Sequence, residues 1–172
     1  MTRLVLMLVM LVMFAMAAPA AAQVPYERIL DAASEPESWL TYSGTYGAQR
    51  YSTLDQITRE NVDQLQPAWV YQTRSSQKFE VSPLVVDGVM YITEPPSDVT
   101  ALDLRTGRPI WRYRRSLPEG IVTCCGQVNR GVALLDDQVF VGTVEPISSR
   151  STPGQAACGG TSRSRTTRWG MR

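Results

Sequence analysis

The sequence predicts an all-β fold built from β-propeller blades, with about three blades in the 172 residues. Two observations carry this prediction. Two stretches, Pro83–Thr93 and Gly131–Thr143, share one plan: a β-branched strand, a turn containing aspartate and a second strand. They lie about 48 residues apart, a spacing typical of four-stranded blades. Between them, Ala101–Trp111 has the form A-x-D-x-x-T-G-x-x-x-W, a turn that returns a tryptophan to the next strand.

The first 22 residues have the pattern of a secretory signal peptide. Arg3 precedes an apolar run from Leu4 to Met16, and small residues follow up to Ala20 and Ala22. The run is too short to span a bilayer comfortably, so we expect cleavage after Ala22 and no stable membrane insertion afterwards. An uncleaved anchor is the alternative. Export places the mature chain in an oxidising compartment, most simply the periplasm, where disulfides persist.

The mature chain begins with two predicted helices. Residues Tyr26–Ala33 form the first, which ends before Pro36. The second begins at Thr58 as N-cap and ends before Pro67, with Val62 and Leu65 on one face.

Strands follow the helices. The short aromatic stretch AWVYQT, residues 68–73, predicts a strand, and SPLVVDGVMYIT predicts a hairpin that turns at Asp87-Gly88. DVTALDL and PIWRYR are the next two strands, joined by a turn through Gly107. GVALLDDQVFVGT then predicts a second hairpin that turns at Asp136-Asp137.

The turn in Ala101–Trp111 has a physical explanation. Asp103 and Thr106 can close it by hydrogen bonds from side chain to backbone, and Gly107 can take a positive φ. Trp111 then returns as a large flat anchor that can lie between neighbouring blades. An ordinary hairpin with a buried tryptophan explains the spacing equally well.

Residues 145–172 differ in composition from the rest. Between Gln23 and Val144, 15 acidic residues outnumber 11 basic ones, whereas the tail holds five arginines and one glutamate among Ser, Thr and Gly. We expect a disordered tail or one translated out of frame. With one base restored, a permitted choice of codons yields DAHLVALDARTG, a second copy of ALDLRTG. A basic arm for nucleic acid is the alternative, but an exported protein has little use for one, so we expect no nucleic-acid partner.

The segment Ala101–Trp111 resembles the tryptophan-docking motif of the pyrroloquinoline quinone (PQQ) dehydrogenases, eight-bladed propellers that oxidise alcohols in the periplasm. WLTYSGTYGAQRYSTLDQITRENVDQLQPAWVYQT is similar to their N-terminal entry into the first blades. KFEVSPLVVDGVMYIT and TCCGQVNRGVAL follow in the family's order. The resemblance covers residues 39–143. It implies that residues 23–144 are the N-terminal part of an incomplete eight-bladed propeller.

The resemblance also implies a cofactor site. Cys124 and Cys125 match a vicinal disulfide that packs against one face of the quinone. Arg130 matches an arginine that binds the cofactor's acidic or quinone oxygens, and Glu80 matches a glutamate that hydrogen-bonds its edge.

Each of these residues also has a simpler interpretation. Neighbouring Cα atoms lie about 3.8 Å apart, closer than a relaxed disulfide prefers, so the two cysteines could be separate buried thiols. Glu80 could be a solvated charge at a strand edge, and Arg130 could pair with Asp136 or Asp137.

The resemblance implies oxidation of an alcohol by hydride transfer to PQQ, with electrons passed to a periplasmic cytochrome c and Ca²⁺ or a lanthanide as Lewis acid. The catalytic aspartate and the metal ligands would lie on later blades, so we assign no catalytic residue and no metal ligand to this chain and expect it to be inactive alone. The absence of histidine excludes His-based metal sites and Ser-His or Cys-His pairs within it. A non-catalytic propeller that acts as a cell-envelope scaffold is the alternative function.

Overall fold

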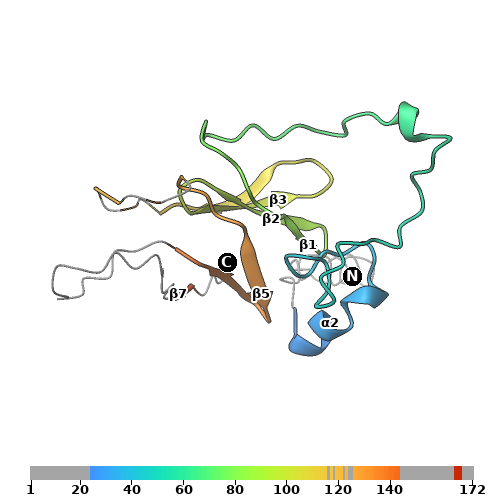
Figure 1. Ribbon diagram of the computed structural model, residues 1–172, viewed down its shortest axis with the longest axis horizontal. Helices are drawn as coiled ribbons and strands as arrows, with labels where there is room; N and C mark the ends of the chain where they lie inside the picture. Colours follow the sequence, from blue (N-terminus) through green and yellow to red (C-terminus); the bar gives the residue numbers. More distant parts are fainter. Residues whose placement is uncertain are drawn as a thin grey trace, which may run out of the picture.

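Each of the two predicted hairpins forms one side of an antiparallel sheet (Figure 1). The computed structural model describes residues 24–115, 117, 119–121, 123, 126–143 and 165–167. The predicted signal peptide, both cysteines of the predicted disulfide and most of the tail lie outside these residues. Those predictions therefore stay predictions.

The first sheet is the predicted four-stranded blade. It consists of β1 (Leu84–Val86), β2 (Val89–Glu94), β3 (Asp98–Asp103) and β4 (Pro109–Tyr113), paired in sequence order. The turn between β1 and β2 has positive φ at both central positions, 50° at Asp87 and 75° at Gly88. An Asp-Gly pair tolerates this conformation and suits a tight hairpin, so the predicted turn is confirmed.

The second sheet contains the second predicted hairpin. Strands β5 (Val132–Leu135) and β6 (Gln138–Val141) pair antiparallel, with φ of 52° at Asp136 in the turn. The backbone of β7 (Arg165–Thr167) pairs with β6. This strand lies within the predicted tail, and the reading frame of that tail stays a prediction.

The first predicted helix is confirmed, but it is divided into two short helical segments. It consists of α2 (Tyr26–Leu30) and a 3-10 turn, η1 (Ala32–Ser34), interrupted at Asp31. The second predicted helix is wrong, because only a 3-10 turn, η2 (Val62–Gln64), forms there. Val62 and Leu65 are more than half exposed, so this short segment buries no apolar face that could stabilise an α-helix.

The strand predicted at residues 68–73 is also wrong. The chain between η1 and β1 runs extended past η2, along the teal-to-green trace of Figure 1. Residues 68–73 pair with no strand in the described part of the chain. Two aromatic side chains of the segment, Trp69 and Tyr71, instead bind the first sheet.

The N-terminal segment joins the two sheets. The backbones of Val24 and Asp136 exchange hydrogen bonds of 2.9 and 2.7 Å, and those of Trp39 and Val85 exchange bonds of 2.7 and 3.1 Å. A single apolar cluster draws on α2, η1, both sheets and the linking segment, and it comprises Val24, Ile29, Ala32, Leu40, Leu84, Val86, Tyr91, Ala101 and Leu134. Because this cluster lies between the sheets and the N-terminal segment, it fixes the first blade relative to the second.

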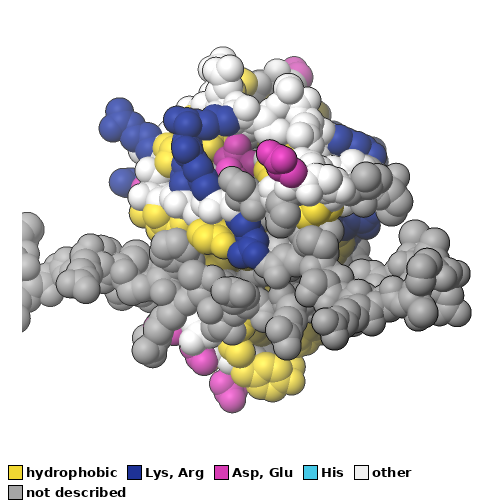
Figure 2. Space-filling view, turned by 90° about the vertical axis from the view of Figure 1, so that its left-hand side faces the viewer, with side chains coloured by type: hydrophobic (Ala, Val, Ile, Leu, Met, Phe, Trp, Pro, Cys, Tyr) yellow, Lys and Arg dark blue, Asp and Glu magenta, His cyan; other side chains and the backbone are white. Residues whose placement is uncertain are grey.

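Charged side chains lie above and between hydrophobic patches on the face shown in Figure 2, with basic groups next to acidic ones. No described helix is long and apolar enough to cross a membrane.

Candidate functional site

The docking turn is closed by Asp103, as predicted. Its Oδ1 accepts hydrogen bonds from the backbone N and the Oγ1 of Thr106, both at 2.8 Å, and from the backbone N of Arg105 at 3.1 Å. The hydrogen bond from the Thr106 hydroxyl is the main reason that the pKa of Asp103 lies below its usual value. Gly107 has φ of 67° and donates from its backbone N to the Asp103 carbonyl at 2.8 Å.

The tryptophan that docks on this turn is Trp69, which the sequence pattern had placed in a strand. Its Nε1 donates to the carbonyl of Leu104 at 2.8 Å. A Cβ on Gly107 would lie 2.6 Å from Cδ2 of Trp69 and closer still to Cε3, so the indole occupies the space that a side chain would need. Glycine is therefore required here by both backbone conformation and close packing.

Trp111 lies in a different environment. It faces Ala101 across the β3–β4 pair, and its ring centroid is 6.0 Å from that of Tyr91. It packs against the apolar cluster at the base of the first sheet. Two tryptophans thus pack on the segment Ala101–Trp111 and its surroundings: Trp69 contacts the turn, and Trp111 lies on β4 against the apolar cluster.

The two segments of the predicted cofactor site lie side by side. The backbone N of Ser82 donates to the carbonyl of Arg130 at 3.2 Å, and Nε2 of Gln77 donates to Oε1 of Gln127 at 3.4 Å. Gly131 packs so closely that a Cβ there would lie 3.1 Å from the Ser82 carbonyl oxygen. These contacts hold residues 77–82 against residues 127–131.

Glu80 and Arg130 meet at this junction. Nη2 of Arg130 lies 3.2 Å from Oε2 of Glu80, so Arg130 pairs with Glu80 and not with Asp136 or Asp137. The side chain of Glu80 is 21% exposed, whereas that of Arg130 is 71% exposed. The fold therefore brings together two of the four predicted site residues.

Lys78 is a residue of this site that the sequence analysis missed. Its Nζ lies 2.6 Å from Oε1 of Glu80. This ion pair, followed by the charge of Arg130, lowers the pKa of Glu80 and keeps its carboxylate ionised. Lys78 stands two residues before Glu80 in extended chain, a spacing that puts both side chains on one side, and this signal could have identified it.

Cys124 and Cys125 lie outside the described residues, so their pairing and their place at the site stay predictions. The described neighbour Gly126 has φ of 88°.

The buried carboxylate of Glu94 anchors the chain segment that leads to the site. Oε1 of Glu94 accepts hydrogen bonds from the hydroxyls of Tyr71 and Thr100, both at 2.8 Å, and its Oε2 accepts one from the backbone N of Arg74 at 3.3 Å. Glu94 is only 6% exposed. Burial is the first cause of the raised pKa of Tyr71. This network fixes residues 71–74, which lead directly into the segment that carries Lys78.

Tyr42 reaches the same junction from the N-terminal segment. The guanidinium carbon of Arg50 lies 4.6 Å from the centre of its ring. A hydrogen bond from Arg50, then one from Ser82, lowers the pKa of Tyr42, and the positive charge of Arg130 contributes to the shift.

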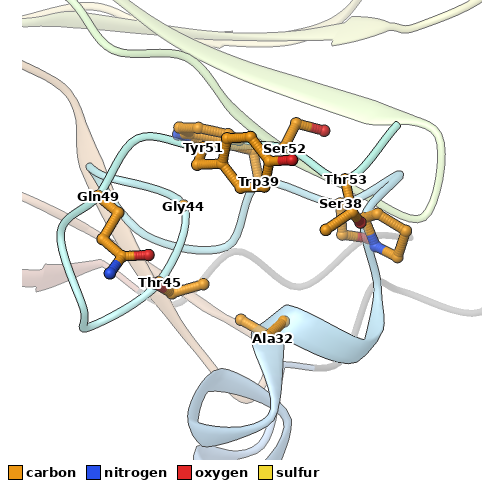
Figure 3. A pocket seen from close by; sticks show the side chains of 11 residues that line it. Ala32, Ser38, Trp39, Gly44, Thr45, Gln49, Tyr51, Ser52 and Thr53 are labelled. Carbon is orange, nitrogen blue, oxygen red and sulfur yellow. The ribbon is translucent and has the colours of Figure 1, made fainter. Parts of the chain in front are cut away.

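A separate pocket of about 250 Å³ lies beside η1 (Figure 3). The Trp39 ring lies against Gly44 at this pocket: a Cβ on Gly44 would approach the ring to 3.1 Å. Every lining residue is uncharged: Ala32, Ala33, Pro36, Ser38, Trp39, Gly44, Thr45, Gln49, Tyr51, Ser52 and Thr53. The pocket offers no charge to an anionic ligand. Within the described ranges, no three His, Cys, Asp or Glu side chains converge to hold a metal ion.

Comparison with known proteins identifies the family. The profile described as "PQQ: Glucose/ethanol/alcohol dehydrogenase, beta-propeller domain" matches residues 39–150. The chain belongs to this family. Two curated relatives agree: a quinohemoprotein alcohol dehydrogenase, ADH-IIG, of Pseudomonas putida is 44% identical over 131 residues, and the 1-butanol dehydrogenase (cytochrome c) of Thauera butanivorans is 45% identical over 109 residues.

Solved structures of two dehydrogenases show the same fold. The quinohemoprotein alcohol dehydrogenase of Comamonas testosteroni matches with a TM-score of 0.64 and 40% identity, over 75% of this chain and 20% of that one. A europium-containing methanol dehydrogenase matches with a TM-score of 0.64 and 33% identity, over 69% of this chain and 21% of that one. Together with the family match, these structures confirm the predicted incomplete propeller.

The chain spans only part of these relatives. The match covers 75% of this chain but 18% of the Pseudomonas putida dehydrogenase, and 62% of this chain but 16% of the Thauera butanivorans enzyme.

The described site residues fit an anionic planar quinone. Lys78, Glu80 and Arg130 carry a net charge of about +1 at neutral pH. Both basic side chains are largely exposed beside the ionised carboxylate. Such a group offers donors to carboxylate and quinone oxygens and one acceptor to a ring N–H.

Proposed function

We propose that this chain is the N-terminal part of a PQQ-dependent alcohol dehydrogenase and supplies one wall of its quinone site. The observation that carries the proposal is the meeting of Glu80 and Arg130, 50 positions apart in sequence, at 3.2 Å. Both residues match cofactor-binding positions of the family, and the fold brings them together by contacts between their own backbone segments.

Each of these side chains has a distinct task in the proposed site. PQQ, when bound, accepts the two electrons removed from the alcohol. Arg130 binds an acidic or quinone oxygen through its planar fork, and Glu80, held ionised by its neighbours, accepts a hydrogen bond from the cofactor's edge. The disulfide between Cys124 and Cys125 forms a flat apolar plate against one face of the ring system.

The remaining features of the proposal concern the longer protein. Residues 1–22 direct export to the periplasm, and cytochrome c accepts the electrons there. Later blades would hold the Ca²⁺ or lanthanide, which would supply Lewis-acid chemistry, and a later aspartate would act as general base. The substrate is a small alcohol, in keeping with the named activities of the relatives.

PQQ titration of the full-length protein that carries this chain tests the proposal. With Ca²⁺ or a lanthanide supplied, we expect PQQ binding and dye-linked oxidation of primary alcohols. Cys124→Ser and Cys125→Ser should weaken PQQ binding to the same extent, because either change opens the same ring, and a thiol reductant should reproduce the loss in the unmodified protein.

Two outcomes would count against the proposal. If the full-length protein binds no PQQ under any metal condition, the non-catalytic scaffold becomes the better explanation. If PQQ binds and both serine variants keep the original affinity, the disulfide has no role in the site.

A further inference from the structure

Lys78 is the only lysine in a chain that contains 16 arginines. Its position is equally distinctive, because it contacts the carboxylate that the family resemblance places at the quinone edge. Lysine differs from arginine in chemistry: its ammonium is a compact charge with three rotatable donors, whereas guanidinium is a planar fork. The positive charge beside Glu80 is therefore carried here by a compact ammonium.

Two cations form ion pairs with Glu80, each with a different carboxylate oxygen. Lys78 takes Oε1 at 2.6 Å, and Arg130 takes Oε2 at 3.2 Å. The carboxylate is mostly covered, while the lysine and arginine side chains are 69% and 71% exposed. Both cations are therefore exposed to solvent beside a carboxylate that is largely covered, and a ligand can reach them.

The charge balance of this triad favours an anionic ligand. Glu80 with Arg130 alone would be neutral, and Lys78 makes the group net positive. An ammonium that donates to Glu80 can donate to a ligand oxygen at the same time, because its donors point in three directions. The ion pair of Arg130 with Glu80 is the longer of the two. If Arg130 leaves it to bind a ligand, Lys78 still balances the negative charge of Glu80.

We infer that Lys78 is a further cofactor-binding residue, which donates to an acidic oxygen of PQQ beside Arg130 and holds Glu80 ionised for its own contact. This inference rests on the proposed function, since the ligand is the quinone of that same site. It adds a third charged contact to the two that the family resemblance implies.

The test measures PQQ affinity of the full-length apoprotein with Ca²⁺ present, by fluorescence quenching at low and high salt. Lys78→Met keeps the length of the side chain and removes its charge, and Lys78→Arg keeps the charge. Arg105→Met is the matched control for net charge. Arg105 lies in the turn after β3, at the opposite end of the first sheet from Glu80, and its side chain is exposed.

We expect Lys78→Met to weaken PQQ binding about tenfold at low salt, the loss of one charge-assisted hydrogen bond. The loss should shrink at high salt. Lys78→Arg should stay within about threefold of the unmodified protein, a difference below 1 kcal/mol. Arg105→Met should bind PQQ normally, and the melting temperature of the apoprotein should be the same in all four proteins.

Three results would overturn the inference: unchanged PQQ affinity in Lys78→Met, an equal loss in Arg105→Met, or a loss accompanied by a lower melting temperature of the apoprotein. The last would assign Lys78 a purely structural role. Failure of the proposed function is distinguishable, because it appears as absence of PQQ binding in the unmodified protein.

Discussion

Gly107→Ala should destabilise the docking turn far more than the same change at Gly88. Both glycines have positive φ, 67° and 75°, so alanine suffers a similar backbone strain at either position. Only Gly107 is crowded: a Cβ there would lie within 2.6 Å of two ring atoms of Trp69, whereas a Cβ on Gly88 meets nothing within 4 Å. The pair of variants therefore separates strain from packing.

The magnitudes follow from these contacts. Left-handed backbone costs alanine about 1 kcal/mol relative to glycine. Carbon atoms normally approach to about 3.5–4.0 Å, so the indole must move by about 1 Å, at a cost of about 1–2 kcal/mol for overpacking. This movement also breaks the hydrogen bond from Trp69 to Leu104, worth about 1 kcal/mol. We expect about 3–4 kcal/mol for Gly107→Ala and about 1 kcal/mol for Gly88→Ala.

Hydrogen exchange of the turn amides, followed by mass spectrometry in the full-length protein, measures this local opening. An additional 2–3 kcal/mol corresponds to exchange roughly 30 to 150 times faster in Gly107→Ala than in Gly88→Ala. In a Trp69→Ala background the difference between the two glycine variants should disappear. Equal exchange in both variants with Trp69 present would refute the packing argument.

Two further predictions concern stability. Arg28 donates to both carboxylate oxygens of Glu35 and of Asp87, so Arg28→Met should lower the free energy of unfolding by about 1–2 kcal/mol at pH 7. Because Arg28 lowers the pKa of both carboxyls in the folded state, this loss should be full above their ordinary pKa of about 4 and should shrink as the pH falls from there through the lowered values. Melting of both proteins across the acid range checks this, and a loss that stays constant or grows as the pH falls would contradict it. The 172-residue chain alone should aggregate and bind no PQQ, because its sheet edges lack the remaining blades. Size-exclusion chromatography with added PQQ checks this. A monomeric peak that binds PQQ would contradict the prediction.

Sequence patterns predicted the local elements well. The Asp-Gly turn, the second hairpin and the Asp103–Gly107 turn all formed, because each is stabilised within about a dozen residues of chain. The errors lie in the segment between η1 and β1. Its apparent helix and strand depend on surfaces elsewhere in the fold, and neither Val62 of η2 nor Leu65 directly after it is buried.

At the candidate site, too, the sequence failed to predict contacts between residues that are far apart in the chain. Glu80 and Arg130 were predicted through family resemblance, but nothing in their sequence neighbourhoods indicates that they would contact each other. Their contact depends on pairing between residues 77–82 and 127–131. Trp69 was missed as the docking residue for a similar reason, because its partner Leu104 lies 35 positions away.

These distant contacts explain how the described part of the propeller holds the residues of the proposed cofactor site together. Trp69 fixes the start of the extended segment on the docking turn, and Glu94 binds Tyr71 and the backbone of Arg74 a few residues later. The segment therefore reaches Lys78 and Glu80 already anchored to the first sheet. Arg130 arrives from the second sheet, which the N-terminal segment joins to the first. The charged triad is thus positioned by contacts within the described residues, and in the proposed function the opposite wall of the quinone site would come from later blades.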